Sequence, residues 1–455
     1  MPPAEETPEL EATKHAKLEN TKPLQFFFVS FAFFRVFRGH GTLRSSRSVA
    51  VALITFATFI DIVAYSVAVP VLPDLSHRLG ASPTTIGLLF ASFGVTLLTV
   101  SIPMGAISDR MGRKAPLVGG MLALAAATLL FAYSEGLPWL FAARLVQGAA
   151  DAVTWVVGFA LIADRYGPDE RGRMSGIVMS GTSAAVMIGP TIGGWLYEAG
   201  GIRAPFLTVA GLAALGAAGF LWLDIPSPRA ETEPVPIGVV LRSPPVAVCT
   251  LAVIAASATM SMLEPVLPLF LAATLGIGPA RIGLLFGSGA LASFILHPIY
   301  GRLTDRWGGR RLMMIGLLLV ACALPLLSVT WSYPWTMAFF VLNTMAMALV
   351  ITPSLTYMAE AVSISGAGSF GVGYGLYNMA WGAGLLGGPA LSGFLYERMG
   401  FAPLTLMWAP MLVVVTWLLA RVQFTVRLKP DATEDRVRLK PDTTEDRVRL
   451  KPGLR

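Results

Sequence analysis

Charged residues are scarce in this chain. Asp, Glu, Lys and Arg make up 13% of its 455 residues and hydrophobic residues 55%, whereas soluble domains carry about 25% charge. A water-soluble fold of this composition would leave far too much apolar surface uncovered. The charges lie at the two ends of the chain and in short loops between apolar runs of roughly 20 residues, the length that crosses a bilayer core. With a mean hydropathy of +0.66, the composition excludes a soluble protein and predicts a membrane protein.

Signatures of catalysis and of redox chemistry are also missing. No Walker A sequence, nucleotide fingerprint, H-E-x-x-H or nucleophile elbow occurs in a plausible context, which argues against an ATP-driven pump or a membrane hydrolase. We therefore predict no enzymatic activity, no catalytic residue, no bound cofactor and no metal. The two cysteines, Cys249 and Cys322, lie within apolar runs, where they act as small hydrophobes and indicate nothing about the redox compartment.

The apolar runs number twelve. They cover residues 49–73, 84–107, 115–134, 137–163, 174–197, 204–223, 245–272, 281–303, 312–330, 334–361, 370–396 and 402–423. Basic residues gather in the loops after the second, fourth and eighth runs: Arg110, Arg113, Lys114, Arg165, Arg171, Arg173, Arg302, Arg306, Arg310 and Arg311. The opposite loops hold few, and the positive-inside rule therefore places both termini in the cytoplasm. The net charge of +7 marks membrane topology and predicts no nucleic-acid partner.

The runs divide the chain into five parts. Residues 1–48 form a cytoplasmic N-terminal segment that we expect to be partly disordered. Residues 49–223 and 245–423 each hold six runs and predict two six-helix bundles. Residues 224–244 are polar and rich in Pro and predict a cytoplasmic linker. Residues 424–455 repeat the sequence VRLKPD and predict a low-complexity cytoplasmic tail.

One block of sequence occurs in both halves. GAISDRMGRK at 105–114 recurs as GRLTDRWGGR at 301–310. Two further landmarks recur in the same order: Pro-Val-Leu-Pro at 70–73 and 265–268, and Gly-Pro at 189–190 and 388–389. The chain therefore looks like a duplication of a membrane-spanning unit. The repeated positions are Gly105, Asp109, Arg110, Gly112, Gly301, Asp305, Arg306 and Gly308.

Duplicated six-helix halves with G-x-x-x-D-R-x-G after the second run resemble the major facilitator superfamily. GAISDRMGRK resembles that superfamily's motif A, and the resemblance implies an all-α fold of twelve transmembrane helices in two pseudo-symmetric six-helix bundles. It also implies that Asp109 belongs to a charge relay, together with Arg110 and Arg113, that latches the cytoplasmic side in the outward-open state. The alternative is a solvated loop whose charges serve topology alone.

ARLVQG at 143–148 resembles motif B of the superfamily. Arg144, Gln147, Asp151 and Trp155 are spaced so that they share one face of a helix. An arginine and an aspartate in an apolar span are costly unless they face a cavity or each other. Since they lie two turns apart, a substrate, a proton site or another helix is expected between them. Alternatively, both close an interhelical network and never touch substrate.

MIGPTIGGWL at 187–196 resembles motif C, which is associated with antiporters of the superfamily. Its Gly189, Pro190, Gly193 and Gly194 predict a bent helix that packs closely on a neighbour. Alanines at 184 and 185 replace glycines that are usual in this motif, which leaves open a generic packing seam of small residues.

Two carboxyl groups lie deep in equivalent apolar runs. Asp61 occupies FIDIVAYSVAVPVLP in the first run and Glu264 occupies LEPVLP in the seventh. Burial disfavours the charged form of a carboxyl, so each can take up a proton near neutral pH. We predict that Asp61, and after it Glu264, binds protons or a cation; the alternative is a neutral, hydrogen-bonded structural carboxyl.

Within the superfamily the chain most resembles vesicular monoamine transporters and their bacterial multidrug efflux relatives, the drug:proton antiporters. TTIGLLFAS, ARLVQG, GPDERGRMSGI, MLEPVLP and YGLYNMAW carry this resemblance. Three polar positions of the amine transporters are replaced, by Phe93, Ala348 and Asn378. Aromatic residues, Tyr377 and Trp155 among them, are candidates to line a cavity or to stack on a cation.

The chain is therefore predicted to be a proton-coupled antiporter that exports small amphipathic or cationic compounds by alternating access. Its predicted partners are a small-molecule substrate, protons and the lipid bilayer, and we expect a monomer in the inner or plasma membrane. A carrier of the same fold for a sugar, organic acid or other metabolite is the first alternative. A non-transporting membrane sensor on this scaffold is the second.

Overall fold

A computed structural model describes residues 47–225, 243–329, 332–364 and 370–421. Over these residues the regular structure is helical, and no strand occurs among them. The predicted N-terminal segment up to residue 46, linker residues 226–242 and the predicted tail lie outside the described residues.

The first half comprises seven α-helices and one short 3₁₀ helix among the described residues. They are α3 (Arg47–Ser66), η3 (Val69–Val71), α4 (Leu72–Leu79), α5 (Pro83–Met111), α6 (Lys114–Tyr133), α7 (Leu137–Arg165), α8 (Pro168–Gly200) and α9 (Arg203–Trp222). The first apolar run was expected to be one helix over 49–73, but α3 ends at Ser66. Pro70 and Pro73 supply no backbone N–H there, so the chain turns through η3 into α4.

The second half comprises six α-helices and one short 3₁₀ helix among the described residues. Its elements are α11 (Pro244–Leu275), α12 (Pro279–Trp307), α13 (Gly309–Ala323), η4 (Leu324–Ser328), α14 (Tyr333–Ile364), α15 (Phe370–Met399) and α16 (Phe401–Arg421). Eleven of the described helical segments are long and apolar enough to cross a membrane. α15 is not one of these eleven, although at 30 residues it is long enough to span a bilayer.

The glycine that ends the repeated motif stops a helix in each half. Gly112 follows α5 with φ +84° and Gly308 follows α12 with φ +81°. Residues other than glycine rarely adopt this backbone conformation. The local fold therefore requires glycine at both copies, which explains why the repeat preserves it.

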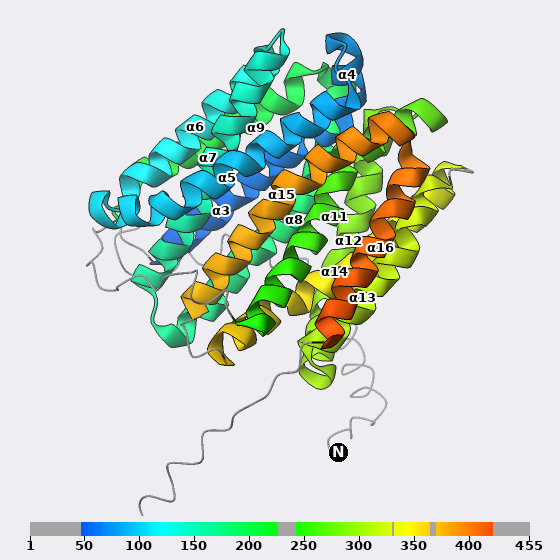
Figure 1. Ribbon diagram of the computed structural model, residues 1–455. Helices are drawn as coiled ribbons and strands as arrows, with labels where there is room; N and C mark the ends of the chain where they lie inside the picture. The colour runs from blue at the N-terminus through cyan, green and yellow to red at the C-terminus, as the bar shows by residue number, and fades with distance from the viewer. Residues whose placement is uncertain (1–46, 226–242, 330–331, 365–369, 422–455) are drawn as a thin grey trace, which may run out of the picture. The chain divides into compact units, whose positions relative to one another are not determined.

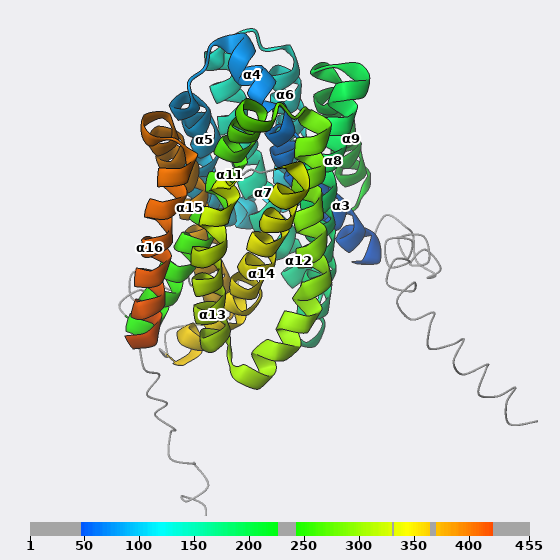
Figure 2. The same ribbon diagram turned by 90° about the vertical axis from the view of Figure 1, so that its right-hand side faces the viewer.

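Four helices form most of the contact between the halves. α5 packs against α15, and α8 packs against α12; Figure 1 shows the first pair side by side and Figure 2 the second. A Cβ atom at Gly87 would lie 2.3 Å from the carbonyl oxygen of Pro389, and one at Gly194 would lie 2.3 Å from that of Pro279. The backbones therefore touch without intervening side chains. We call the end of the molecule that carries α4 the α4 end; α16 ends at the opposite end (Figure 1).

Candidate functional site

Asp61 lies in α3 and is almost wholly buried, with 2% of its surface exposed. No N–H or hydroxyl donor among the described residues reaches either of its carboxyl oxygens. Its neighbour is a second carboxyl, the buried Asp151 of α7, and the indole of Trp155 lies within hydrogen-bonding reach of Asp151. Two carboxylates side by side in apolar surroundings cannot both be ionised without a compensating cation. The pair is therefore suited to holding a proton or a cationic group.

Arg144 of α7 is completely buried, and aromatic rings surround it. Its guanidinium carbon lies 4.3 Å from the ring centroid of Phe90, 5.2 Å from that of Tyr65 and 5.3 Å from that of Phe131. These rings come from α5, α3 and α6. Each can interact with the cation through its π face, so three helices contribute to holding one guanidinium in the bundle.

The hydrogen bonds of Arg144 leave part of its guanidinium unused. Nη1 donates to the backbone carbonyl of Tyr65 and to Oε1 of Gln147, each at 3.3 Å. Tyr65 lies in the last turn of α3, where carbonyls lack partners because the helix stops. Gln147 in turn donates to Thr128 at 3.4 Å. Nε and Nη2 of Arg144 have no acceptor, and no carboxylate forms an ion pair with it, among the described residues.

One hydrogen bond links the polar clusters of the two halves. The hydroxyl of Tyr65 in α3 donates to the carboxylate of Glu264 in α11. The ring of Tyr65 is held by Phe90 and Phe93, with centroid distances of 5.8 and 4.8 Å. Tyr65 thus touches Arg144 on one side and Glu264 on the other. The structure brings together Asp61 with Asp151, and Arg144 with Gln147 and Glu264 through Tyr65.

Two predicted residues on α15 lie apart from this cluster. Tyr377 is half-buried, accepts a hydrogen bond from Ser354 at 3.2 Å and stacks on Trp381 at 6.2 Å. Asn378 is half-buried beside it. No described hydrogen bond joins either residue to Asp61, Arg144 or Glu264. Trp155 stacks on Phe159 at 5.6 Å, so its ring contacts an aromatic residue of its own helix.

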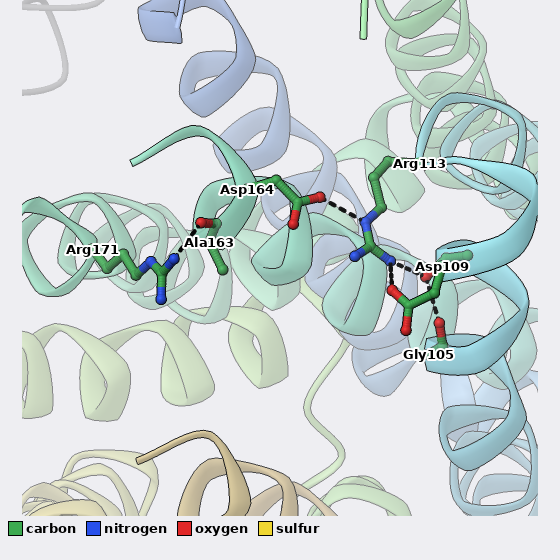
Figure 3. A network of polar contacts seen from close by, with 7 residues as sticks. Gly105, Asp109, Arg113, Ala163, Asp164 and Arg171 are labelled. Atoms are coloured by element: carbon green, nitrogen blue, oxygen red, sulfur yellow. Dashed lines mark hydrogen bonds and ion pairs between the residues drawn. The ribbon is translucent and has the colours of Figure 1, made fainter. Parts of the chain in front are cut away.

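Motif A of the first half forms a charge network around Arg113 (Figure 3). Nη1 of Arg113 lies 2.6 Å from Asp109, and Nε donates to Asp164 at 2.8 Å. Burial lowers the pKa of the Arg113 guanidinium, but the hydrogen bonds and charges of Asp164 and Asp109 outweigh this effect and raise it. Arg113 therefore stays charged and joins the α5–α6 connection to the end of α7. The exposed Arg110 takes no part in this network.

The second copy of motif A forms different contacts. Gly309 stands where the first half has Arg113, and Asp305 and Arg306 are exposed and make no ion pair among the described residues. Arg310 instead donates to the carbonyls of Leu419 and Ala420 at 2.7 and 2.6 Å, at the C-terminus of α16. The first glycine of the motif makes no tight contact in either copy. Gly105 has only Val156 near its Cβ position, and Gly301 has no neighbour there.

We expect Arg113→Ala to weaken the first half measurably. The variant leaves Asp164, whose side chain is 32% exposed, without its partner, and it removes the buried aliphatic part of the Arg113 side chain. We expect the free energy of unfolding to fall by about 1–2 kcal/mol. Thermal unfolding in detergent should show a lower midpoint. Lys114→Ala, one residue further on, is the matched control and should leave the midpoint unchanged; equal midpoints for both variants would contradict this role of Arg113.

The glycines of motif C pack α8 on two helices. A Cβ atom at Gly189 would lie 2.1 Å from Oγ of Ser66, and one at Gly193 would lie 2.8 Å from the carbonyl of Val67. Gly194 faces Pro279 of the other half, and the carbonyl of Pro190 lies 2.3 Å from the Cβ position of Gly283 in α12. Motif C therefore lies where the first half contacts the second.

Comparison with known sequences identifies the family. The sequence model described as Major Facilitator Superfamily matches residues 54–260 and again residues 249–451. The chain belongs to the Major Facilitator Superfamily. The all-helical fold and the family predicted from the sequence are thereby confirmed, and this major facilitator is a multi-pass membrane transporter.

Curated relatives of this major facilitator include vesicular transporters. The synaptic vesicular amine transporter of Homo sapiens is 27% identical over 356 residues, which cover 77% of this chain and 68% of the relative. The probable vesicular acetylcholine transporter-B of Danio rerio is 27% identical over 421 residues, 87% of this chain and 84% of the relative. The predicted resemblance to vesicular amine transporters is confirmed by these matches.

Solved structures agree on the fold of this major facilitator. A bacterial homologue of the human lysosomal transporter Spinster, in an inward-facing and occupied conformation, aligns with a TM-score of 0.70 and 16% identity over 85% of this chain and 99% of that one. The human organic anion transporter MFSD10 aligns with a TM-score of 0.62 and 18% identity over 82% and 99%. At these identities the likeness concerns the fold alone.

Two residues of the site were not singled out by the sequence prediction. Tyr65 lies in the first apolar run, and its hydroxyl links the polar clusters of the two halves. Asp164 follows the fourth apolar run, and it binds the arginine of motif A. The sequence offers one hint of this pair, because Arg113 of the first motif copy is replaced by Gly309 in the second.

Proposed function

We propose that this major facilitator is a proton-coupled antiporter that exports small amphipathic or cationic compounds. The observation that carries the proposal is the buried pair of Asp61 and Asp151, in which neither oxygen of Asp61 meets an N–H or hydroxyl donor among the described residues. A proton and a cationic substrate can each neutralise such a pair, and they compete for it. Competition of this kind is what antiport requires.

The link between halves supplies a route from protonation to movement. Tyr65 of α3 donates to Glu264 of α11, so rocking of one bundle against the other has to break or reform this bond. The positive charge of Arg144 lies against the same tyrosine. Protonation of Glu264 removes the charge that accepts the bond, which ties the charge state of the site to its geometry.

The relatives point to organic cations as substrates. Two are named for transport of amines or acetylcholine in vesicles, and the carboxyl pair is chemically suited to the same class. A membrane potential contributes about 2.3 kcal/mol per charge and 100 mV, enough at that voltage to sustain roughly a forty- to fifty-fold gradient for each charge moved. The distribution of Lys and Arg supports cytoplasmic termini. We propose further that the carrier acts as a monomer in the plasma membrane.

One observation favours a second candidate. Nε and Nη2 of Arg144 are buried and have no acceptor among the described residues, and a guanidinium binds carboxylates through two such donors. An organic-acid carrier would use this arginine as its substrate site. In that case Asp61 would keep a structural proton and take no part in exchange.

Transport into proteoliposomes separates the two candidates. Purified protein is reconstituted, a pH gradient is imposed, and uptake of tetraphenylphosphonium, a neutral sugar and an organic anion is compared. We expect the cation to accumulate on the acidic side and the other two solutes to stay at equilibrium. Accumulation of the anion with no movement of the cation would instead assign the site to Arg144.

A further inference from the structure

The α4 end holds a pair of carboxylates that cross between the halves. Glu198, in the last turn of α8, accepts a hydrogen bond from the backbone N–H of Ala280 at 3.0 Å. Glu397, in the last turn of α15, accepts one from the backbone N–H of Thr84 at 2.9 Å. Ala280 is the second residue of α12 and Thr84 the second residue of α5. Each half thus places a carboxylate on the start of a helix of the other half.

The two contacts are copies of each other. The carboxylates end the sequence Leu-Tyr-Glu, which occurs at 196–198 and again at 395–397. The helices that receive them begin at Pro83 and at Pro279. Proline has no N–H, so the second residue supplies the first backbone donor of each helix. Duplication has therefore preserved the acceptor and the start of the helix together, although Thr84 and Ala280 differ.

Physical chemistry makes these contacts attractive only while the halves touch. The first N–H groups of a helix lack partners within it and carry the positive end of its dipole. A carboxylate placed there makes a charge-assisted hydrogen bond. Once the halves separate at the α4 end, water replaces both partners and the interaction ends.

The surrounding packing shows that the halves do touch here. A Cβ atom at Gly393 would lie 2.5 Å from the carbonyl of Pro83, and one at Gly283 would lie 2.3 Å from that of Pro190. At the opposite end the described ion pairs, Arg113 with Asp109 and with Asp164, stay within the first half. Charge contacts that join the halves through a helix start are found, among the described residues, at the α4 end.

We propose that Glu198 and Glu397 are positioning residues that latch the α4 end closed and set the balance between the two access states of the transporter. Both contacts exist in the state closed at the α4 end and neither survives its opening. The latch acts on the bundles themselves, so it requires neither a particular substrate nor protons.

The test is a distance measurement on the full chain without substrate or gradient. Cys249→Ala and Cys322→Ala remove the native thiols. His77→Cys of α4 and Thr274→Cys near the end of α11 then carry the spin labels. Both positions are exposed at the α4 end and lie in different halves. Electron–electron double resonance then reports short distances for the closed state and long distances for the open state. Substitutions at the two glutamates are compared in this background.

We expect Glu198→Gln with Glu397→Gln to raise the open-to-closed ratio about threefold to thirtyfold, since two charge–dipole contacts are weakened. Alanine at both positions removes the acceptors as well and should raise the ratio further. The matched control is Glu135→Gln. Glu135 is exposed in the connection from α6 to α7 and makes no hydrogen bond or ion pair within the described residues.

An unchanged ratio in the double glutamine variant overturns the proposal, as does an equal change in the Glu135 control. Glutamine has nearly the shape of glutamate and still accepts a hydrogen bond, so this variant decides the matter if the alanine variant does not fold. Because the readout needs no transport, a failed latch and a failed antiport mechanism give different results.

Discussion

Asp61→Asn should abolish proton-driven transport while leaving the protein folded. The amide has the size of the carboxyl and cannot take up or release a proton near neutral pH, so the site loses the group for which proton and substrate compete. We expect pH-driven accumulation of tetraphenylphosphonium in proteoliposomes to fall by at least about a hundredfold, on the order of 3 kcal/mol of lost coupling. Thermal unfolding should change little, since no N–H or hydroxyl donor reaches either oxygen of Asp61 among the described residues.

Two further variants make this result specific. Asp151→Asn removes the neighbouring carboxyl but leaves Asp61 able to exchange a proton, so a smaller loss with altered pH dependence is expected. Glu135→Gln changes an exposed carboxyl in the connection from α6 to α7 that is not part of the pair, and this variant should transport normally. Normal accumulation by Asp61→Asn would show that the carboxyl pair is structural.

Arg144→Lys should reduce transport by more than about tenfold, although the positive charge is kept. The guanidinium lies against three rings while donating to the Tyr65 carbonyl and to Gln147. An ammonium is a compact point charge without a planar face, and it cannot meet these contacts together. The loss of stacking and of one hydrogen bond corresponds to about 1–3 kcal/mol. Initial transport rates measure the loss of transport, and thermal unfolding measures the loss of stability.

Arg203→Lys is the matched control for this substitution. Arg203 also lies over an aromatic ring, 4.9 Å from the centroid of Tyr133, but it is exposed at the start of α9. A solvated pair of this kind contributes little. Equal effects of the two substitutions would mean that the enclosure of Arg144 has no special role.

The sequence was sufficient to predict the scaffold because the scaffold is repeated and periodic. Apolar runs of spanning length and the motif at 105–114 and 301–310 each carry their information within a short stretch of chain. The end of α3 at Ser66 could not be predicted from its prolines. The same Pro-Val-Leu-Pro sequence lies inside α11 and does not interrupt that helix. Two prolines therefore permit a break without enforcing it.

The site was less accessible from sequence because its contacts join distant helices. Asp61 and Asp151 were both named as candidates, yet nothing in their spacing indicates that α3 and α7 bring them together. The rings around Arg144 come from three helices, and cation–π contacts have no signature along the chain. At Phe93, where a polar position of the amine transporters is replaced, the ring packs on Tyr65. The sequence alone shows this only as a missing polar group.

Differences between the halves also proved informative. Arg113 occurs in one copy of motif A and Gly309 in the other. Among the described residues, the ion-pair network of this motif is found in the first half, where Arg113 binds Asp164. The Leu-Tyr-Glu repeat shows the reverse case, because its two copies make the same contact. Residues unique to one half point to chemistry, and residues kept in both point to the moving parts.

Competition between a cation and a proton for the carboxyl pair of Asp61 and Asp151 can be measured directly. Purified transporter in weakly buffered detergent at pH 7, with a pH indicator, is titrated with tetraphenylphosphonium while binding is followed by calorimetry. We expect release of about one proton for each cation bound to the unchanged protein and no proton release from Asp61→Asn. Binding without proton release, or equal release from the variant, would contradict it.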